Sequence, residues 1–313
     1  MKHTVSITAL LLLVFILAQI NGLFVLDYYI NIKQSAIEGK TVIYEEAYQQ
    51  SNITAPQVEN ESSSYVYILI ALIFGTLLVL VLIKYKQRKL WKVWFLLSVI
   101  VTLIISMNSW MFRFFGTSGI TPLYLYFTTV ILCGILGYYK VFRHNIFIHN
   151  FTEIFIYGGL AALLVPILNL ISITIVLLVV AVYDMYAVWK SKHMIVMAQF
   201  QTQEKLFAGL CIPYSKKEYT TPITSQTSSK PLHKTEQKVS TAILGGGDVA
   251  FPLLFAGVVM KTTGSYLAPI FVIICTTISL GLLFYYGEKG KFYPAIPFVA
   301  AGCFVGYGLF LLL

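Results

Sequence analysis

The chain has 313 residues, of which 58% are hydrophobic and only 11% are charged, whereas about a quarter of the residues in soluble domains are charged. This composition excludes an ordinary soluble domain and predicts an all-α polytopic membrane protein embedded in the lipid bilayer. The formal net charge of +9 does not indicate a nucleic-acid-binding protein, because the basic residues are scattered between apolar segments without interleaved aromatic residues.

Nine apolar segments are long enough to cross a bilayer as helices, which takes about 20 residues each. In chain order they are residues 4–26, 65–83, 90–112, 121–139, 150–167, 170–189, 241–260, 266–286 and 292–313. The first is long for a signal peptide and no small-residue cleavage site follows it, so we expect it to remain as a helix. We expect a turn at residues 166–172 to separate the fifth and sixth segments.

Basic residues divide unevenly between the two sides of this arrangement. If successive loops alternate across the membrane, 18 basic residues fall on one side and four, Lys33, Lys40, Arg113 and Lys261, fall on the other. Cytoplasmic loops carry the excess of Lys and Arg in membrane proteins. The sequence therefore predicts a multi-pass protein of the cell membrane with nine transmembrane helices, a cytoplasmic amino terminus and an extracellular carboxyl terminus.

Long loops divide the chain into three parts. Residues 1–190 hold the first six helices and an external loop at 27–64 that we expect to be solvated, residues 191–240 form a cytoplasmic connection, and residues 241–313 hold the last three helices. Within the connection, apolar residues between 192 and 210 recur in a pattern compatible with an amphipathic helix along the membrane. Residues 213–240 have no apolar period and indicate a flexible tether.

Only three acidic residues lie within the predicted helices: Glu153, Asp184 and Asp248. An ionisable residue inside a membrane is costly and often functional, although a local hydrogen bond or ion pair can also retain one. Asp184 lies six residues before Lys190, and Asp248 lies seven residues after Thr241. Both aspartates therefore reach roughly 9 to 10 Å from the cytoplasmic ends of consecutive helices.

Two carboxyl groups at one depth on consecutive helices can form a catalytic pair. In a shared desolvated site they cannot both ionise easily, so one stays protonated. The charged member can then take a proton from water while the neutral member donates one to the carbonyl oxygen of a peptide bond. This chemistry predicts an aspartic endopeptidase that needs no metal ion, no cofactor and no covalent nucleophile.

Two backbone-loosening motifs reach the same depth. A glycine run at residues 245–247 comes directly before Asp248. Its residues tolerate positive φ angles, and we expect them to permit close approach of an extended substrate. Small residues also allow helices to pack closely, so a packing role for these glycines remains an alternative. Pro294 and Pro297 stand near the start of the last segment. They remove amide donors and leave carbonyl groups open there, although proline is also common at a helix start.

These motifs occur in a fixed order along the chain: the pair Tyr183 and Asp184, then Gly245, Gly246, Gly247 and Asp248, then Pro294, Ala295 and Ile296. In this order they resemble the YD, GxGD and PAL motifs of the presenilin and signal peptide peptidase family of intramembrane aspartyl proteases. Ile296 replaces the leucine of the third motif. The short chain is most similar to the archaeal presenilin homologues, and the cytoplasmic amino terminus is that of the presenilin branch.

The resemblance implies a role for each motif. Asp184 and Asp248 would be the catalytic pair, while Tyr183, the glycine run and the segment at 294–296 would bind or position the substrate. By the same resemblance, the partners would be single-span membrane proteins with external amino termini. It implies no obligatory partner subunit.

Two other functions remain compatible with the sequence. An ion or solute transporter also uses helices that carry Asp and are broken by glycine and proline, although both acids lie nearer one face than the midplane. A catalytically silent chaperone of membrane helices would use the same cavity. His149 and Glu153 are four residues apart, and this pair favours a hydrogen bond or ion pair over a metal site, which needs more ligands.

Overall fold

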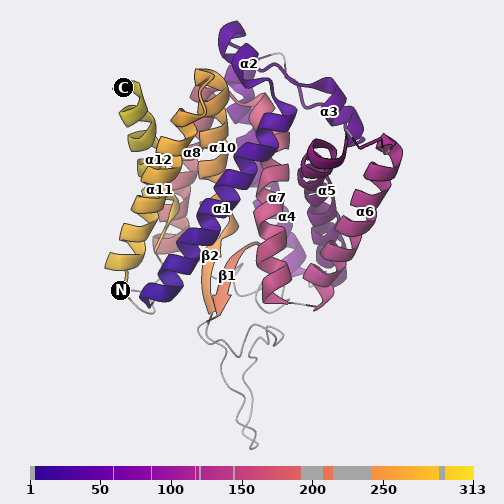
Figure 1. Ribbon diagram of the computed structural model, residues 1–313. Helices are drawn as coiled ribbons and strands as arrows, with labels where there is room; N and C mark the ends of the chain where they lie inside the picture. The colour runs from indigo at the N-terminus through magenta and orange to yellow at the C-terminus, as the bar shows by residue number, and fades with distance from the viewer. Residues whose placement is uncertain are drawn as a thin grey trace, which may run out of the picture.

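The described part of the chain is a bundle of long apolar helices that run between two ends of the molecule (Figure 1). A computed structural model describes residues 4–58, 60–85, 87–116, 118–119, 121–143, 145–191, 207–213, 241–288 and 293–313. The long helices are α1 (Val5–Tyr29), α4 (Ser64–Lys84), α5 (Arg88–Phe115), α6 (Pro122–Tyr138), α7 (Ile146–Leu164), α8 (Leu170–Tyr186), α10 (Gly246–Thr263), α11 (Leu267–Tyr286) and α12 (Ile296–Leu311).

Seven of the helices in the described ranges are long and apolar enough to cross a membrane. They match the first six predicted segments and the eighth, which confirms a polytopic membrane fold. The helices α10 and α12, with 18 and 16 residues, are shorter than the segments predicted for them. The number of nine spans and their orientation therefore remain predictions.

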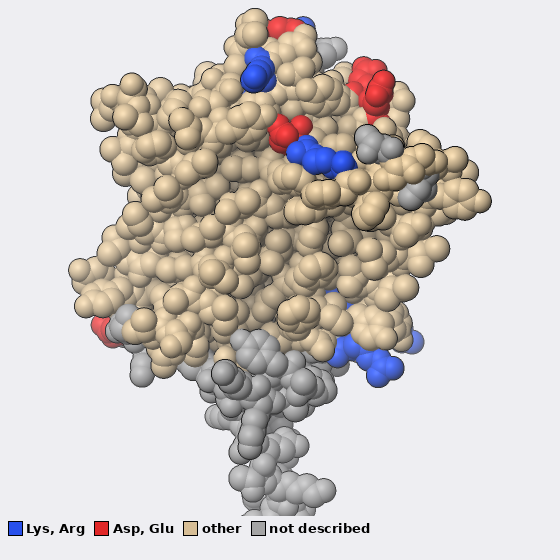
Figure 2. All heavy atoms as spheres, viewed as in Figure 1, with Lys and Arg blue, Asp and Glu red and all other residues tan. Residues whose placement is uncertain are grey.

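Charge and chain direction agree with a membrane-spanning bundle. On the face shown in Figure 2, a broad band without charged side chains separates the charged residues at the two ends. The amino and carboxyl ends lie at opposite ends of the bundle (Figure 1), as an odd number of spans requires. Large apolar side chains such as Leu13, Phe74 and Ile131 are more than half exposed on its outside, which suits contact with lipid tails.

The helix α10 occupies the interior of the bundle. It packs against α1, α7, α8, α11 and α12, and every residue from Pro252 to Lys261 along it is buried. Its first turn carries Asp248. The predicted catalytic residue Asp248 therefore lies at the amino-terminal end of α10, a helix that is surrounded by other helices of the bundle.

A two-stranded antiparallel sheet lies at the end of the bundle where the chain begins (Figure 1). Strand β1 (Gly209–Pro213) pairs with β2 (Thr241–Gly245), with Gly209 opposite Gly245 and Cys211 opposite Ile243. One predicted boundary is therefore wrong, because the seventh helix begins at Gly246 instead of residue 241. The fold is mostly helical, with this small sheet as an addition that was not predicted. The end of the predicted amphipathic helix, residues 209–210, is also strand.

Local sequence explains why these residues pair as strands. Thr241 and Ile243 are β-branched and favour extended backbone, while the glycines that follow are poor helix formers. Gly209 has a φ of +145°, and a Cβ atom there would lie 2.3 Å from the carbonyl oxygen of Leu244. Only glycine permits this approach of the two strands. Residues 192–206 and 214–240, predicted as an amphipathic segment and a tether, lie outside the described residues.

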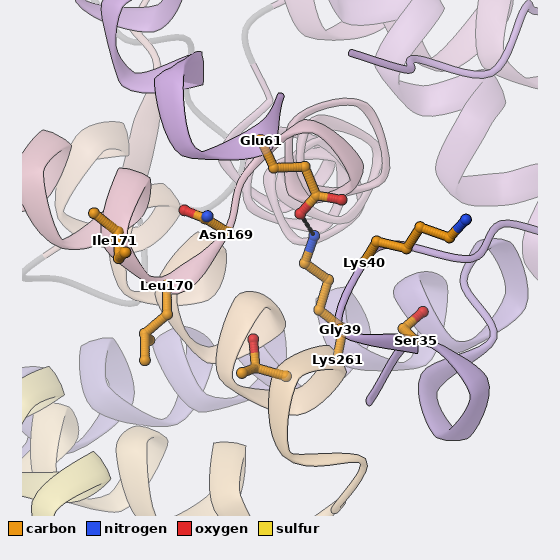
Figure 3. Close-up of a pocket in the computed structure, with 9 residues that line it drawn as sticks. Ser35, Gly39, Lys40, Glu61, Asn169, Leu170, Ile171 and Lys261 are labelled. Carbon is orange, nitrogen blue, oxygen red and sulfur yellow. Dashed lines mark hydrogen bonds and ion pairs between the residues drawn. The ribbon is translucent and has the colours of Figure 1, made fainter. Parts of the chain in front are cut away.

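The loop at 27–64 is more ordered than a solvated connection. It contains α2 (Ile32–Glu38), α3 (Glu45–Gln50) and the 3-10 turn η1 (Glu61–Ser63). Tyr48 is only 1% exposed, and its hydroxyl donates to the carbonyl of Ala162 at 2.8 Å. In Figure 3 Lys261 of α10 points toward Glu61, whose Oε2 lies 3.0 Å from its Nζ. Buried contacts therefore fix this loop to the end of the bundle.

Candidate active site

Asp184 is held inside the bundle by the period of α8. Ile173, Leu177, Ala181 and Asp184 recur at helical spacing on one face, and all four are buried. Asp184 lies in the last turn of α8 and is only 4% exposed. The preceding Tyr183 lies on another face of the same helix and is 42% exposed. The two residues of this motif therefore have different surroundings, one within the protein and one toward the membrane side.

Asp248 lies where strand β2 gives way to α10. Gly245 caps the helix in an extended conformation, and Asp248 stands in the first turn. The side chain is close to the backbone of the cap, since a Cβ atom on Gly245 would lie 3.1 Å from Oδ2 of Asp248. Unpaired amide groups and the helix dipole stabilise a negative charge at this end of a helix.

The start of α12 connects the surroundings of the two aspartates. The backbone N–H of Ile296 donates to Oδ2 of Asp184 at 3.4 Å, a long hydrogen bond. The Cδ1 atom of Ile296 lies 3.8 Å from the position that a Cβ atom would take on Gly247, the residue before Asp248. Pro294 and Ala295, just before the helix, are buried as well. The three motifs that stand far apart in the sequence thus meet at one place.

The glycine run is distinguished by the short distances to its neighbours and not by unusual backbone angles. None of Gly245, Gly246 and Gly247 has a positive φ, so their tolerance of positive φ is not used in this structure. A Cβ atom on Gly246 would lie 3.2 Å from the carbonyl oxygen of Ala208 and 3.3 Å from the hydroxyl of Tyr157. Gly247 has ordinary room, with its nearest neighbours at 3.6 Å or more. Close approach is therefore a property of Gly245 and Gly246, and not of Gly247.

A polar face of α7 holds strand β1 in place. Asn150 donates from Nδ2 to the carbonyl of Cys211 at 2.6 Å and accepts from its N–H at 2.9 Å. One residue earlier, His149 places Nε2 2.8 Å from the carbonyl oxygen of Gly209. These side chains bond the edge of β1 that faces away from β2. Because Gly246 donates to Ala208 at 3.1 Å, fixing β1 also fixes the start of α10.

A buried ion pair lies beneath this face. Lys140 Nζ is 2.6 Å from Oε1 of Glu153, with side-chain exposures of 1% and 2%, and it is 3.3 Å from Nδ1 of His149. Glu153 is thus held by an ion pair whose partner is Lys140. Lys140, counted as a loop residue in the charge analysis, is buried with it. Among the described residues no group of three or more His, Cys, Asp or Glu side chains could hold a metal ion.

Two apolar cavities flank α4 and lead toward the aspartates. One, of about 610 Å³, lies between α4, α5, α7 and α10 and reaches Gly246 and Gly247. The other, of about 650 Å³, lies between α4 and α8 and reaches Tyr183. Both touch Phe251. Gly247, which precedes Asp248, therefore lines the first cavity, and Tyr183, which precedes Asp184, lines the second.

The comparisons with known proteins agree with this arrangement. The family model described as signal-peptide peptidase, presenilin aspartyl protease matches residues 35–313. The chain belongs to this family. It is accordingly an intramembrane-cleaving aspartyl protease, a hydrolase, and a multi-pass membrane protein. No curated protein matches the chain.

Two solved structures share the fold of this presenilin-family chain. Each is described as a presenilin family intramembrane aspartate protease, one in space group C222 and one in space group P2. The first is 14% identical, with a TM-score of 0.60 over 98% of this chain and 99% of the other. The second is 16% identical, with a TM-score of 0.55 over 94% and 96%. At such identities the likeness shows the fold alone.

Sequence reasoning found the motif residues of this family but missed their supports. Asp184, Ile296 and Gly247 come together as described, whereas Tyr183 lines the cavity on the α4 side. The residues that hold the sheet, Asn150 and Gly209, carry no motif. Asn150 stands at the predicted start of a helix, where a polar side chain indicates only the end of the apolar segment. The short continuous apolar run from Leu210 to Ile212, bounded by Gly209 and Pro213, was the available signal for a buried strand.

Proposed function

We propose that Asp184 and Asp248 together hydrolyse a peptide bond within or near the transmembrane segment of a single-span membrane protein. The observation that carries this proposal is the bridge made by Ile296, which contacts Asp184 with its backbone and approaches Gly247 with its side chain. The reaction class is that of the family. The assignment of the catalytic pair and of the substrate is inferred from the site.

The surroundings of the two carboxyl groups suit different roles. Asp248 stands at a helix amino terminus, where negative charge is stabilised, so we assign it the charged form that takes a proton from water. Asp184 is buried near a helix carboxyl terminus, and we assign it the neutral form that donates its proton to the carbonyl oxygen. The water oxygen bonds the carbonyl carbon, the C–N bond breaks, and the amine leaves with the proton that Asp248 received. As the diol-like intermediate collapses to the new carboxyl group, one of its hydroxyl groups returns a proton to Asp184, so both aspartates regain their starting forms.

Strand β2 offers the substrate a place to pair in extended form. Backbone groups of successive residues in a strand point to opposite edges. Because Gly246 bonds Ala208 of the β1 side, the N–H and C=O groups of Ile243 and Gly245 face the outer edge of β2. Within the described ranges no further strand covers that edge. A peptide added there would run past Asp248, and strand addition exposes a peptide bond that a helix hides.

The cavity of about 610 Å³ suits the part of the substrate that stays helical. It is open beside α4, which is the least buried of the seven long apolar helices. Its inner end meets Gly246 and Gly247, where the protein backbone is bare. We propose that the protein acts in the cell membrane with its amino terminus in the cytoplasm, by itself and without a cofactor. The three-part division at residues 190 and 240 belongs to the same proposal, with the sheet joining the second and third parts.

The test is cleavage of a candidate single-span substrate by the protein purified in detergent, with the products identified by mass spectrometry. Asp184→Asn and Asp248→Asn should each reduce cleavage below detection while leaving thermal unfolding close to that of the wild type. Asp27→Asn is the matched control, because Asp27 pairs with Arg113 at 3.2 Å in the external part of the bundle. Undiminished cleavage by either active-site variant would remove that residue from the catalytic pair.

A further inference from the structure

The 3-10 turn η1 lies at the end of the bundle opposite the aspartates and contacts both of the helices that carry them. On the α8 side, Ser172 Oγ donates to the backbone carbonyl of Glu61 at 2.5 Å. Asn169, the amino-terminal cap of α8, donates to Ser62 Oγ at 2.6 Å. On the α10 side, Lys261 Nζ lies 3.0 Å from Oε2 of Glu61. Glu61 therefore joins the outer ends of the two helices that carry the aspartates.

The contact between Glu61 and Lys261 is enclosed and supported by further hydrogen bonds. The Lys261 side chain is only 4% exposed, and that of Glu61 is 18% exposed. The N–H of Thr41 donates to Oε1 of Glu61 at 2.8 Å, and the Lys261 ammonium group also donates to the Thr41 hydroxyl. Figure 3 shows the Lys261 side chain extending to the Glu61 carboxylate, with Asn169 nearby. An ion pair that is buried and has these additional partners holds one geometry.

The same turn leads directly into α4. The turn ends at Ser63 and α4 begins at Ser64. Two apolar cavities, of about 610 and 650 Å³, flank this helix. A substrate segment that enters either cavity contacts α4, and the outer end of α4 is attached to the turn that joins α8 and α10.

Rigid helices connect these outer contacts to the aspartates. Asp184 lies 12 residues after Ser172 on α8, and Lys261 lies 13 residues after Asp248 on α10. At a rise of 1.5 Å per residue, these separations are about 18 and 20 Å. A misplacement of about 1 Å by a remote change can cost about 10²-fold in rate. A shift of that size at the outer ends of α8 and α10 would therefore affect the reaction.

We propose that Glu61 is a positioning residue, which sets how α8 and α10 lie relative to each other through its contacts with Ser172 and Lys261. These two helices carry Asp184 and Asp248, so their relative placement sets the distance between the two carboxyl groups. The inference rests on the proposed function, because it assigns a residue that acts through the catalytic pair. Since η1 leads into α4, displacement of α4 by a bound substrate reaches both catalytic helices at Glu61.

A double variant separates positioning from stability. Glu61→Gln and Lys261→Met each leave a buried charge without its charged partner, so each should lower the melting temperature. Glu61→Gln/Lys261→Met removes both charges and should recover most of that loss, because replacement of a whole buried pair is often neutral. The connection to α10 stays broken, so kcat for a single-span substrate should remain at least about tenfold below the wild type, with KM within about twofold. A merely structural role would let kcat return with the melting temperature.

The placement of the two helices is measured without any cleavage. Nitroxide labels at Tyr186→Cys, the last residue of α8, and at Ile243→Cys of β2, just before α10, occupy exposed positions near the aspartates. The half-exposed Cys275 is replaced by alanine so that it takes no label. Pulsed electron spin resonance should show a shifted or broader distance distribution in Glu61→Gln/Lys261→Met than with the native pair.

A matched control and a milder variant complete the experiment. Asp27 and Arg113 pair at 3.2 Å and join α1 to α5, two helices that carry neither catalytic residue. Asp27→Asn/Arg113→Met should change neither kcat nor the distance distribution. Ser172→Ala removes one hydrogen bond and no charge, so the protein should fold. Because it loosens the α8 side of the same connection, it should lower kcat and change the distribution in the same direction.

Two results would overturn the inference. A double variant at residues 61 and 261 that regains both the melting temperature and the kcat of the wild type would show that the pair serves stability alone. An unchanged distance distribution in that variant and in Ser172→Ala would show that η1 does not place the helices. A wild-type protein that cleaves no single-span substrate would contradict the proposed function instead, and the distance comparison would still decide the role of Glu61.

Discussion

The two hydrogen bonds between Asn150 and Cys211 make a strong prediction about the sheet. Asn150→Ala removes both bonds, of 2.6 and 2.9 Å, and leaves the backbone groups of Cys211 buried, since that residue is only 3% exposed. At about 1 kcal/mol net for each bond, the sheet loses about 2 kcal/mol, and more if the buried groups stay unpaired. The open form of the sheet should therefore become about 30 times more populated, or more.

Amide hydrogen exchange measured by mass spectrometry tests this directly. Peptides that cover residues 207–213 and 241–246 should exchange faster by that factor in Asn150→Ala, while peptides from α11 should not change. Cleavage of a substrate should also yield products at neighbouring positions, because a strand that is less firmly held slips in register.

The control is a second amide, Asn21, which bonds α7 but, within the described ranges, makes no hydrogen bond to the sheet. Asn21 donates to Ile154 at 2.9 Å and accepts from Trp110 at 2.9 Å, so Asn21→Ala also loses two hydrogen bonds. It should lower overall stability by a similar amount without faster exchange in the sheet. If the sheet peptides of Asn150→Ala exchanged at the wild-type rate, the claim that α7 holds β1 would be refuted.

The buried ion pair and the glycine run give two further predictions. Lys140→Met and Glu153→Gln should each cost about 3 to 5 kcal/mol of unfolding free energy, because each leaves one buried charge unpaired. The double variant should cost less than the sum by at least about 2 kcal/mol in a denaturant-unfolding cycle, and strict additivity would contradict this. Gly246→Ala should lower both stability and cleavage, because its Cβ atom would meet an oxygen at 3.2 Å. Gly247→Ala should leave the melting temperature unchanged and raise KM, since its nearest protein atoms are 3.6 Å away; equal effects of the two changes on the melting temperature would argue against this distinction.

The sequence predicted the long helices well because hydropathy alone decides them. In lipid every backbone group must be satisfied within the segment, so an apolar run of sufficient length has only one common solution. The same rule failed at residues 241–245, where an apolar run pairs with β1 inside the protein instead. The partner strand β1 ends at Pro213, 28 positions before β2 begins at Thr241. No local sequence pattern predicts that pairing.

The chemical core of the site was predictable, whereas its support was not. Two acids in apolar segments stand out because burial of a carboxylate is costly. The partner of Glu153 did not stand out, because Lys140 was one of many basic residues near a predicted helix end. Only the three-dimensional structure shows that the π-helical turn η2 (Tyr139–Arg143) turns it inward. Residues that act through the tertiary fold alone leave no periodic trace in the sequence.

The contrast between α4 and α10 bears on how far a chain of this kind can diverge. A side chain that faces lipid needs only to be apolar and of tolerable size, so the positions of α4 that line neither cavity should accept several residue types with little change in free energy. Phe255 of α10 is fully enclosed and touches Phe304 edge to face, with ring centroids 5.5 Å apart, so substitutions there meet neighbours on every side. Substitutions will therefore accumulate on the outer helices first. The match at a TM-score of 0.60 and 14% identity shows that this fold persists when most of the sequence has changed.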